Sequence, residues 1–371
     1  MSRCVGEPVE KTPLPAHWLT GHLPISLAKR PRSELDPRTM ERERLREYLA
    51  ARLPSAKDIV IARLERTGGG ASRETWLVDA EWTENGERTV RPLIIRRDPT
   101  ASVLETDRRI EFEVLRAARE IPVPVPQTYW LEEDGSWLER PFMVMERVSG
   151  VAPPVVFPIT ESDEVRRAIA EEYATYLVRI HRADWRKFGL EFLGVPASGE
   201  AAARTQVEWW EREYQRSKLE ERPVLAVALH WLATHLPKRS EIVLVHADYR
   251  AGNFLYENGH ITAILDWEMV HLGDPMEDLA WAVLPFWSSG GLCQGLQLRD
   301  DMIAAYERAG GMPVDRERLF FYEVLGAVKM AVISLTGVKS FCEGRNCETV
   351  LALVGFMVPR LEADLIEKLQ I

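Results

Sequence analysis

The sequence predicts an α+β fold in which a small β-rich N-terminal part precedes a larger, mainly helical C-terminal part. Two observations carry this prediction: residues 58–147 hold mostly short strand-like runs, and after Gly150 the apolar residues change to helical spacing. One helical stretch, 105–120, interrupts the strands. The chain has 371 residues, which is long for one core and favours two lobes or domains.

Composition and charge exclude several classes of protein. Hydrophobic residues make up 46% and charged residues 28%, which is typical of a folded globular chain. The net charge of -10 disfavours a nucleic acid or an anionic membrane as partner, since both need a concentrated positive field. The four cysteines form no metal-binding spacing and the N-terminus lacks an apolar signal segment, so we expect a cytoplasmic protein. The apolar stretch 324–338 contains Lys329 and is shorter than the roughly 20 residues of a membrane span, so it predicts a buried helix.

The first predicted segment, residues 1–56, is an arm followed by a leading helix. Residues 1–35 are rich in proline and show no periodicity, so we expect an arm that lies on the surface or is disordered. Asp36 and Pro37 suit an N-cap and a first helical position, and the helix should run to about residue 53.

The second predicted segment is an N-terminal lobe, residues 57–147, with the order β-β-β-α-β-β. Its strands include DIVIARLE, GGGASRETWLVDAEW, RTVRPLIIRRD and PFMVMERV. The helix at 105–120 must end before IPVPVP, because alternating prolines forbid helix.

The third predicted segment, residues 148–371, is a helical C-terminal lobe. Helices are expected over 161–182, 204–219, 223–236, 297–309, 316–340 and 348–369. One clear strand pair interrupts them, FLYE and HITAIL, joined by Asn258 and Gly259 in a two-residue hairpin turn.

The strongest chemical signal is His246-x-Asp248-x-x-x-x-Asn253, which matches the spacing of a kinase catalytic loop. Phosphoryl transfer needs a carboxylate to orient the attacking hydroxyl and accept its proton, and oxygen ligands to hold Mg²⁺ against the nucleotide phosphates. Asp248 is the predicted catalytic base and Asn253 a metal ligand. His246 is expected to hold backbone.

The hairpin returns the chain and places Asp266 at the end of the strand AILDWE, where it is the predicted principal Mg²⁺ ligand. Glu268 would point to the same side if the strand continued. It is then either a supplementary metal ligand or a solvated side chain.

The phosphates also need cover and positive charge. Gly69, Gly70 and Ser72 lie in a glycine-rich turn between two strands, which favours a phosphate-side loop, although no Walker A motif is present. No lysine occurs between Lys57 and Lys187, so the strand cation of kinases must be replaced. Arg96 or Arg97 can serve, and we expect Arg96 to point inward with Glu111 or Glu113 of the next helix as partner.

Several blocks of the sequence, among them the motifs described above, resemble the aminoglycoside phosphotransferase-like (phosphotransferase enzyme) family of small-molecule kinases. The resemblance runs from about Arg63 to the C-terminal helices and is carried by GGGASRETWLV, IIRRDP, EFEVLRAAREIPVPVP, PFMVMERVSG, LVHADYRAGNFL and ILDWEMVHLGDPMEDLAW. The branch that they resemble includes the kinase-like domains fused to some acyl-CoA dehydrogenases.

The resemblance implies a bilobal protein-kinase-like fold with ATP and Mg²⁺ between the lobes. It places Arg96 beside the phosphates and the backbone from Met145 to Arg147 at the adenine hinge, and it makes Asp278 and His181 structural supports. The family usually has glycine where Ala247 stands, a change that is tolerated unless this residue needs a positive φ.

Two other function classes compete with a small-molecule kinase. A protein kinase would carry D-F-G and an activation segment ending in A-P-E, and neither is present. A catalytically weak kinase-like module that only binds nucleotide would be favoured by loss of the base or of a metal ligand, yet Asp248, Asn253 and Asp266 are all present. We therefore expect transfer of the ATP γ-phosphoryl group to a hydroxylated small molecule, either aminoglycoside-like or a hydroxylated acyl or acyl-CoA-like compound. Trp209, Trp210 and Trp287 are expected in the core rather than in an acceptor pocket.

Overall fold

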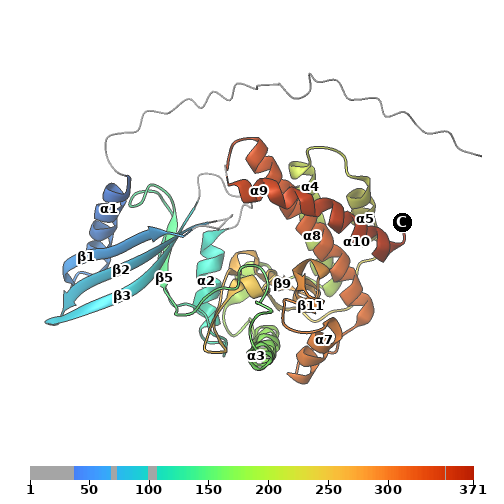
Figure 1. Cartoon of the computed structure of the whole chain (residues 1–371), viewed down its shortest axis with the longest axis horizontal. Helices are drawn as coiled ribbons and strands as arrows, with labels where there is room; N and C mark the ends of the chain where they lie inside the picture. The colour runs from blue at the N-terminus through green and yellow to red at the C-terminus, as the bar shows by residue number, and fades with distance from the viewer. Residues whose placement is uncertain (1–36, 68–72, 99–106, 347) are drawn as a thin grey trace, which may run out of the picture.

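Five antiparallel strands form the sheet of the N-terminal lobe in the order β1-β2-β3-β5-β4. The computed structural model describes residues 37–67, 73–98, 107–346 and 348–371. The strands are β1 (Lys57–Arg66), β2 (Glu74–Glu84), β3 (Glu87–Arg97), β4 (Thr128–Glu132) and β5 (Phe142–Glu146). The element order confirms the predicted β-β-β-α-β-β lobe, and the sheet lies at the left of Figure 1.

Two helices flank this sheet. Helix α1 (Pro37–Arg52) buries Leu45, Tyr48 and Leu49 against the sheet, with Val78, Ile95 and other strand residues in the same core. Helix α2 (Arg108–Ala118) is capped by Asp107, whose carboxylate accepts from Arg109 N. It lies between the sheet and the helical lobe in Figure 1, so its side chains can reach both. The predicted N-terminal arm and the predicted N-cap Asp36 lie outside the described residues.

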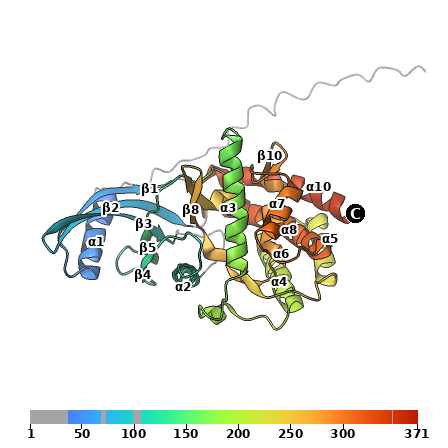
Figure 2. The same ribbon diagram turned by 90° about the horizontal axis from the view of Figure 1, so that it is seen from below.

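The C-terminal lobe is mainly helical, as predicted, and it packs around one long core helix. Its helices are α3 (Asp163–His181), α4 (Gly199–Ser217), α5 (Pro223–Thr234), α6 (Met276–Ala282), α7 (Arg299–Arg308), α8 (Arg316–Cys342), α9 (Thr349–Leu353) and α10 (Val358–Leu369). Helix α8 contacts α4, α5, α6, α9 and α10. Helix α3 runs along the side of this lobe that faces the viewer in Figure 2.

Helix α8 is the one helix in the described part of the chain that is long and apolar enough to cross a membrane. Of its most apolar 18-residue window, 89% is buried inside the protein. This burial confirms the prediction of a core helix.

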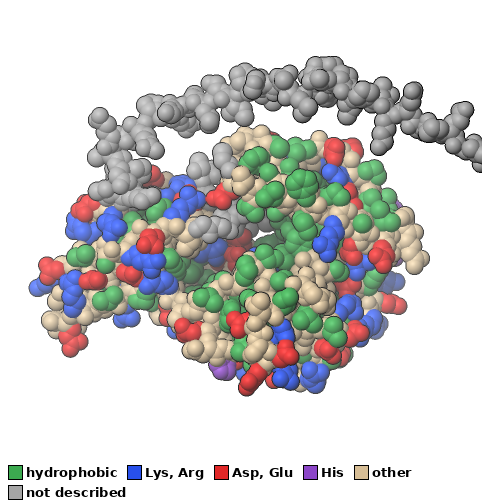
Figure 3. Space-filling view, viewed as in Figure 1, with side chains coloured by type: hydrophobic (Ala, Val, Ile, Leu, Met, Phe, Trp, Pro, Cys, Tyr) green, Lys and Arg blue, Asp and Glu red, His purple; other side chains and the backbone are tan. Residues whose placement is uncertain are grey.

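The described part of the C-terminal lobe also contains three short strand pairs, and the loops that hold its predicted site residues follow β6 and β8. The predicted hairpin is β7 (Phe254–Glu257) and β8 (His260–Ile264), and its turn residues Asn258 and Gly259 have φ of 52° and 80°. The expectation of one strand pair in this lobe was wrong, because β6 (Val243–Val245) pairs with β9 (His271–Gly273), and β10 (Ser288–Ser289) pairs with β11 (Leu292–Cys293). Strands of two or three residues are too short to show a period. Figure 3 shows the surface hollowed between the sheet and the helical lobe.

The candidate active site

The loop that follows β6 is held by Asp278 of α6. The carboxylate of Asp278 accepts hydrogen bonds from His246 N at 2.8 Å and from Ala247 N at 2.7 Å, and lies 3.1 Å from His181 Nε2. Burial alone would raise the pKa of Asp278, but the contact with His181 and the backbone donors hold it below its usual range. Asp278 therefore stays ionised and fixes the first two residues of the loop.

Ala247 adopts the left-handed conformation, with a φ of 66°. This conformation costs a non-glycine residue roughly 1–2 kcal/mol. The position therefore requires a positive φ, and the alanine here is strained where the resemblance would place glycine. The hydrogen bonds that His246 N and Ala247 N donate to Asp278 help to hold it.

His246 joins the loop to the end of the hairpin. Burial lowers the pKa of His246 despite the nearby carboxylates, so the ring is neutral. Its Nδ1 accepts from Asp248 N at 3.2 Å, which leaves Nε2–H to donate to the carbonyl of Leu265 at 3.0 Å. Leu265 N in turn donates to the carbonyl of Asn253 at 2.7 Å. His246 thus holds backbone, as predicted, and brings Asp248, Asn253 and the residue before Asp266 together.

The Asp248 carboxylate is oriented by two donors. Asn253 Nδ2 donates to Asp248 Oδ2 at 2.6 Å, and Trp281 Nε1 donates to Oδ1 at 2.9 Å. Arg250 Nε lies 3.3 Å from the same Oδ1. Because the amide nitrogen of Asn253 faces Asp248, its side-chain oxygen is directed elsewhere and is available to a cation.

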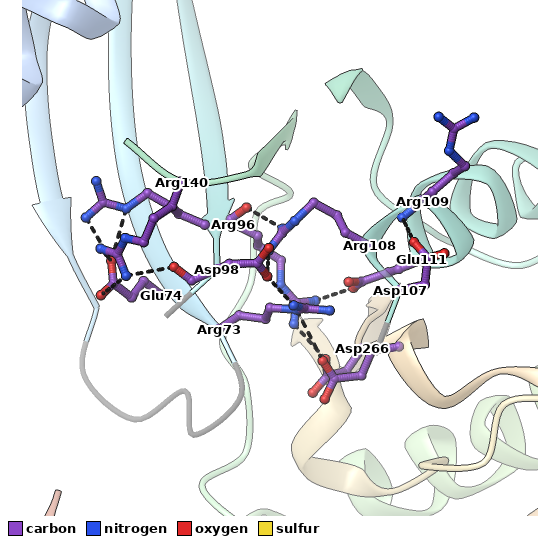
Figure 4. Close-up of polar contacts among 12 residues, drawn as sticks. Arg73, Glu74, Arg96, Asp98, Asp107, Arg108, Arg109, Glu111, Arg140 and Asp266 are labelled. Atoms are coloured by element: carbon purple, nitrogen blue, oxygen red, sulfur yellow. Dashed lines mark hydrogen bonds and ion pairs between the residues drawn. The ribbon is translucent and has the colours of Figure 1, made fainter. Parts of the chain in front are cut away.

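Arg96 connects the N-terminal lobe to the loop after β8. Nη1 donates to Glu111 Oε1 at 2.5 Å and Nη2 to Asp266 Oδ1 at 2.8 Å (Figure 4). Glu113 pairs with Arg116 instead, and Arg97 pairs with Glu74 on the other face of the sheet. Of the open alternatives, the structure therefore selects Arg96 and Glu111.

Asp266 has a φ of 67° and precedes the 3₁₀ turn η4 (Trp267–Met269), so the strand does not continue. Burial would raise the pKa of Asp266, but the charge and hydrogen bond of Arg96 lower it overall. Asp266 is therefore ionised at neutral pH, as a ligand for a divalent cation must be.

Glu268 is buried, so the alternative of a solvated side chain was wrong. Its side chain is 8% exposed and Oε2 lies 3.5 Å from Arg73 Nε. Burial raises the pKa of Glu268 to about 8, and the charge of Asp266 acts in the same direction. The carboxyl group is thus mostly protonated at neutral pH while Asp266 beside it is charged.

A network of arginines and carboxylates surrounds this contact (Figure 4). Asp98, the residue after β3, accepts from Arg73 and from Arg108, and Arg108 Nη1 donates to the carbonyl of Arg96 at 2.6 Å. These contacts join the strand that carries Arg96 to the helix that carries Glu111. The arginine is therefore held by its backbone as well as by its two carboxylate partners.

The other predicted nucleotide contacts divide into two groups. Gly69, Gly70 and Ser72 lie outside the described residues. Met145 lies on β5, where its backbone pairs with Ile94 of β3 and with Thr128 of β4. Arg147 follows the strand, and its guanidinium pairs with Asp79 Oδ1 at 2.5 Å. Arg147 N also donates to the carbonyl of Pro92 at 3.3 Å, which leaves the carbonyl of Arg147 as the part that could face a base.

The donor set fits Mg²⁺. Within the described ranges, no group of three or more His, Cys, Asp or Glu side chains is arranged to hold a metal. Asp266 supplies one carboxylate and Asn253 one amide oxygen. Mg²⁺ keeps several waters and usually binds through one or two protein oxygens together with substrate phosphates, so this sparse set suits it better than a closed protein cage would.

Two side chains that contact Asp248 were not predicted. Trp281 lies three residues after Asp278 on α6, so the two share a helix face. The spacing in EDLAW was a signal that could have found it. Arg250 lies inside the catalytic motif, and its guanidinium carbon is 5.0 Å from the ring centroid of Trp287.

The sheet, the helical lobe and the loops between them define a bilobal kinase-like fold. The model of the phosphotransferase enzyme family matches residues 63–320, so the chain belongs to that family. Among solved structures, a putative aminoglycoside phosphotransferase from Ralstonia eutropha is 22% identical with a TM-score of 0.67, covering 88% of this chain and 97% of its own. A thermostable mutant of APH(4)-Ia, in ternary complex with AMP-PNP and hygromycin B, is 17% identical with a TM-score of 0.58, covering 87% and 98%. These likenesses confirm the predicted fold class.

Curated relatives include two much longer proteins. Mouse acyl-CoA dehydrogenase family member 10 is 32% identical over 57% of this chain and 20% of the relative, and human member 11 is 27% identical over 76% and 38%. The chain thus spans about a fifth to two fifths of the length of these two proteins. Viomycin phosphotransferase from Streptomyces vinaceus is 28% identical over 45% of this chain and 59% of the relative.

Proposed function

We propose that this protein transfers the γ-phosphoryl group of ATP, with Mg²⁺, to a hydroxyl group of a small molecule. The observation that supports this most is the convergence of Asp248, Asn253 and the Asp266 loop through the two hydrogen bonds of Leu265. Phosphoryl transfer requires a base, hard oxygen ligands for the metal and a cation beside the phosphates, and Arg96 is held next to these ligands by Glu111 and by Asp266 itself.

In the proposed reaction the acceptor hydroxyl hydrogen-bonds to the Asp248 carboxylate. The hydroxyl oxygen bonds to the γ-phosphorus, the bond from that phosphorus to the β,γ-bridging oxygen breaks, ADP leaves, and Asp248 accepts the hydroxyl proton. Asn253 and Trp281 hold the carboxylate in place. Arg96 is positioned to meet negative charge on the phosphates. Bound Mg²⁺, held by Asp266 and Asn253, would supply further charge neutralisation.

The acceptor is proposed from the relatives. The ternary complex of an aminoglycoside phosphotransferase with hygromycin B favours an aminoglycoside-like molecule. The acyl-CoA dehydrogenase family members favour a hydroxylated acyl or acyl-CoA compound. Since one neighbour, APH(2″)-IIIa, is a complex with GDP and kanamycin, both ATP and GTP belong in the test. A reducing cytoplasm is the compartment that we propose.

The test is incubation of the full chain with Mg-ATP or Mg-GTP and a panel of aminoglycosides, hydroxy acids and hydroxyacyl-CoAs, followed by ³¹P NMR. We expect a new phosphomonoester signal with one acceptor class, and its loss when EDTA removes Mg²⁺. Binding of nucleotide without phosphorylation of any compound would overturn the proposal and favour the catalytically weak nucleotide-binding module.

A further inference from the structure

Helix α6 presents two side chains to the catalytic loop, and only one of them contacts backbone. Asp278 holds the amides of residues 246 and 247, while Trp281 donates its indole N–H to Asp248 Oδ1 at 2.9 Å. Trp281 is 2% exposed. A buried indole donor cannot be replaced by bulk water when it is removed, so its hydrogen bond sets the orientation of the carboxylate directly.

Behind Trp281 lies Lys329, a lysine buried in the middle of the core helix α8. It is 2% exposed, and its Nζ donates to the carbonyl of Ala247. The same atom lies 4.5 Å from the centroid of the Trp281 ring and 3.9 Å from Glu277 Oε1. A buried ammonium group is costly unless it is paired in this way, so its place in an apolar helix indicates a specific task.

Lys329 and Asp278 hold the same strained residue from opposite ends. Asp278 accepts from Ala247 N, and Lys329 donates to Ala247 O. Ala247 has a φ of 66°, a conformation that a non-glycine residue leaves readily when it is not held. The peptide that follows Ala247 leads directly into Asp248. The orientation of that peptide therefore determines the position of the Asp248 backbone, from which the catalytic carboxylate extends.

We infer that Lys329 and Trp281 are positioning residues for phosphoryl transfer, with Lys329 fixing the peptide before Asp248 and supporting the ring whose N–H orients its carboxylate. This inference rests on the proposed function of Asp248 as base. The two residues act on the acceptor side of the reaction, because their contacts described above are with the catalytic loop and α6 and do not include Arg96 or Asp266.

The inference predicts a loss of kcat without a matching loss of nucleotide affinity. Trp281→Phe keeps an aromatic ring and removes the N–H, while Lys329→Met keeps most of the volume and removes the ammonium group. Each should lower kcat about 10–100-fold, since small displacements of a reacting group cost that much. The KM for ATP should stay close to the wild-type value. The double variant should lose less than the product of the two single losses, because both act through one carboxylate.

The chain offers a matched control for each variant. Trp82→Phe removes another buried indole, on β2 of the N-terminal lobe, whose N–H donates to Glu84 Oε2 at 3.4 Å. Lys339→Met removes another lysine of α8, whose Nζ donates to the carbonyl of Arg216 at 2.6 Å. Both controls should retain the wild-type kcat. Equal losses in the controls, or a rise in KM for ATP that accounts for the effect, would overturn the inference.

A second readout separates this inference from the proposed function. Backbone amide exchange of residues 246–248, followed by mass spectrometry or NMR, should be at least about tenfold faster in Lys329→Met than in Lys339→Met, because opening of the loop becomes about 1.4 kcal/mol easier. If the wild-type protein phosphorylates no compound, the proposed function fails while this exchange test still decides the positioning role. Unchanged exchange would contradict that role whatever the activity.

Discussion

Arg96 and Asp266 join the two lobes directly: Nη2 of Arg96, on β3, donates to Oδ1 of Asp266, on the loop after β8, at 2.8 Å. The same carboxylate is the proposed principal ligand of Mg²⁺. The phosphate-side cation and the metal ligand are therefore coupled, and a change in either should alter nucleotide binding.

Replacement of Arg96 by lysine should weaken nucleotide binding about 10–100-fold, because a single ammonium group cannot meet both Glu111 and Asp266, and lost hydrogen bonds between charged groups cost about 1.5–3 kcal/mol. The KM for ATP measures this. Arg97→Lys is the matched control, since Arg97 is the next residue of the same strand and bonds Glu74 on the opposite face. An Arg96 variant with the same KM as the Arg97 variant would contradict the assignment.

Asp266→Asn should abolish the effect of Mg²⁺ on nucleotide affinity. The amide keeps the shape of the side chain and removes the charge that a hard divalent cation needs. Calorimetric titration of ADP, with and without Mg²⁺, measures the difference for the variant and for the wild type. The assignment fails if Mg²⁺ strengthens ADP binding equally in both proteins.

Glu268→Gln should remove a pH dependence of stability. In the folded protein the pKa of Glu268 is about 8, against an ordinary value of 4.5, with Asp266, Arg96, Glu111 and Arg73 as its charged neighbours. Between these two values the folded state retains a proton that the unfolded chain has released, so the free energy of unfolding falls as pH rises through this window.

The variant cannot ionise at this position. Its free energy of unfolding should therefore equal that of the wild type at pH 4 and exceed it above pH 8, by on the order of a few kcal/mol. Thermal unfolding at unit steps of pH measures the difference. Parallel Tm curves for the two proteins would show that the pKa of Glu268 is the same in the folded and the unfolded chain, which would contradict the prediction.

Ala247→Gly should not destabilise the protein, although glycine usually does. Relief of the left-handed φ is worth roughly 1–2 kcal/mol, against about 0.5–1 kcal/mol of extra backbone entropy in the unfolded chain. Ala251→Gly is the control, because Ala251 is also fully buried in this loop and its φ is not positive. In denaturant unfolding, the free energy of unfolding of Ala247→Gly should be higher than that of Ala251→Gly. The reverse order would argue against strain at residue 247.

Much of the site could be predicted because its signals are local in sequence. The offset from Asp248 to Asn253 and the Asn258-Gly259 turn place the proposed base and both proposed metal ligands within about 20 residues, and a short hairpin has few alternative geometries. Arg96 was predictable because strand alternation sends Arg96 and Arg97 to opposite faces.

The rest depended on contacts between distant residues. Helix α6 has seven residues, all of them buried, so it shows no apolar face to detect. The contact of Trp281 with Asp248 spans 33 positions and exists only because α6 packs behind the loop. The alternative of a solvated Glu268 was wrong because the chain turns at Asp266 instead of continuing as a strand. The limits of the three predicted segments, 1–56, 57–147 and 148–371, stay predictions.

The central claim is that Asp248 accepts the proton of the acceptor hydroxyl, and Asp248→Asn tests it most directly. The amide still bonds Asn253 or Trp281 but cannot act as a base, so kcat with the acceptor found in the panel should fall about 10²–10⁴-fold. The dissociation constant of Mg-ADP, measured by calorimetry on the same preparation, should be unchanged. A variant that binds nucleotide and transfers phosphate at the wild-type rate would contradict the account.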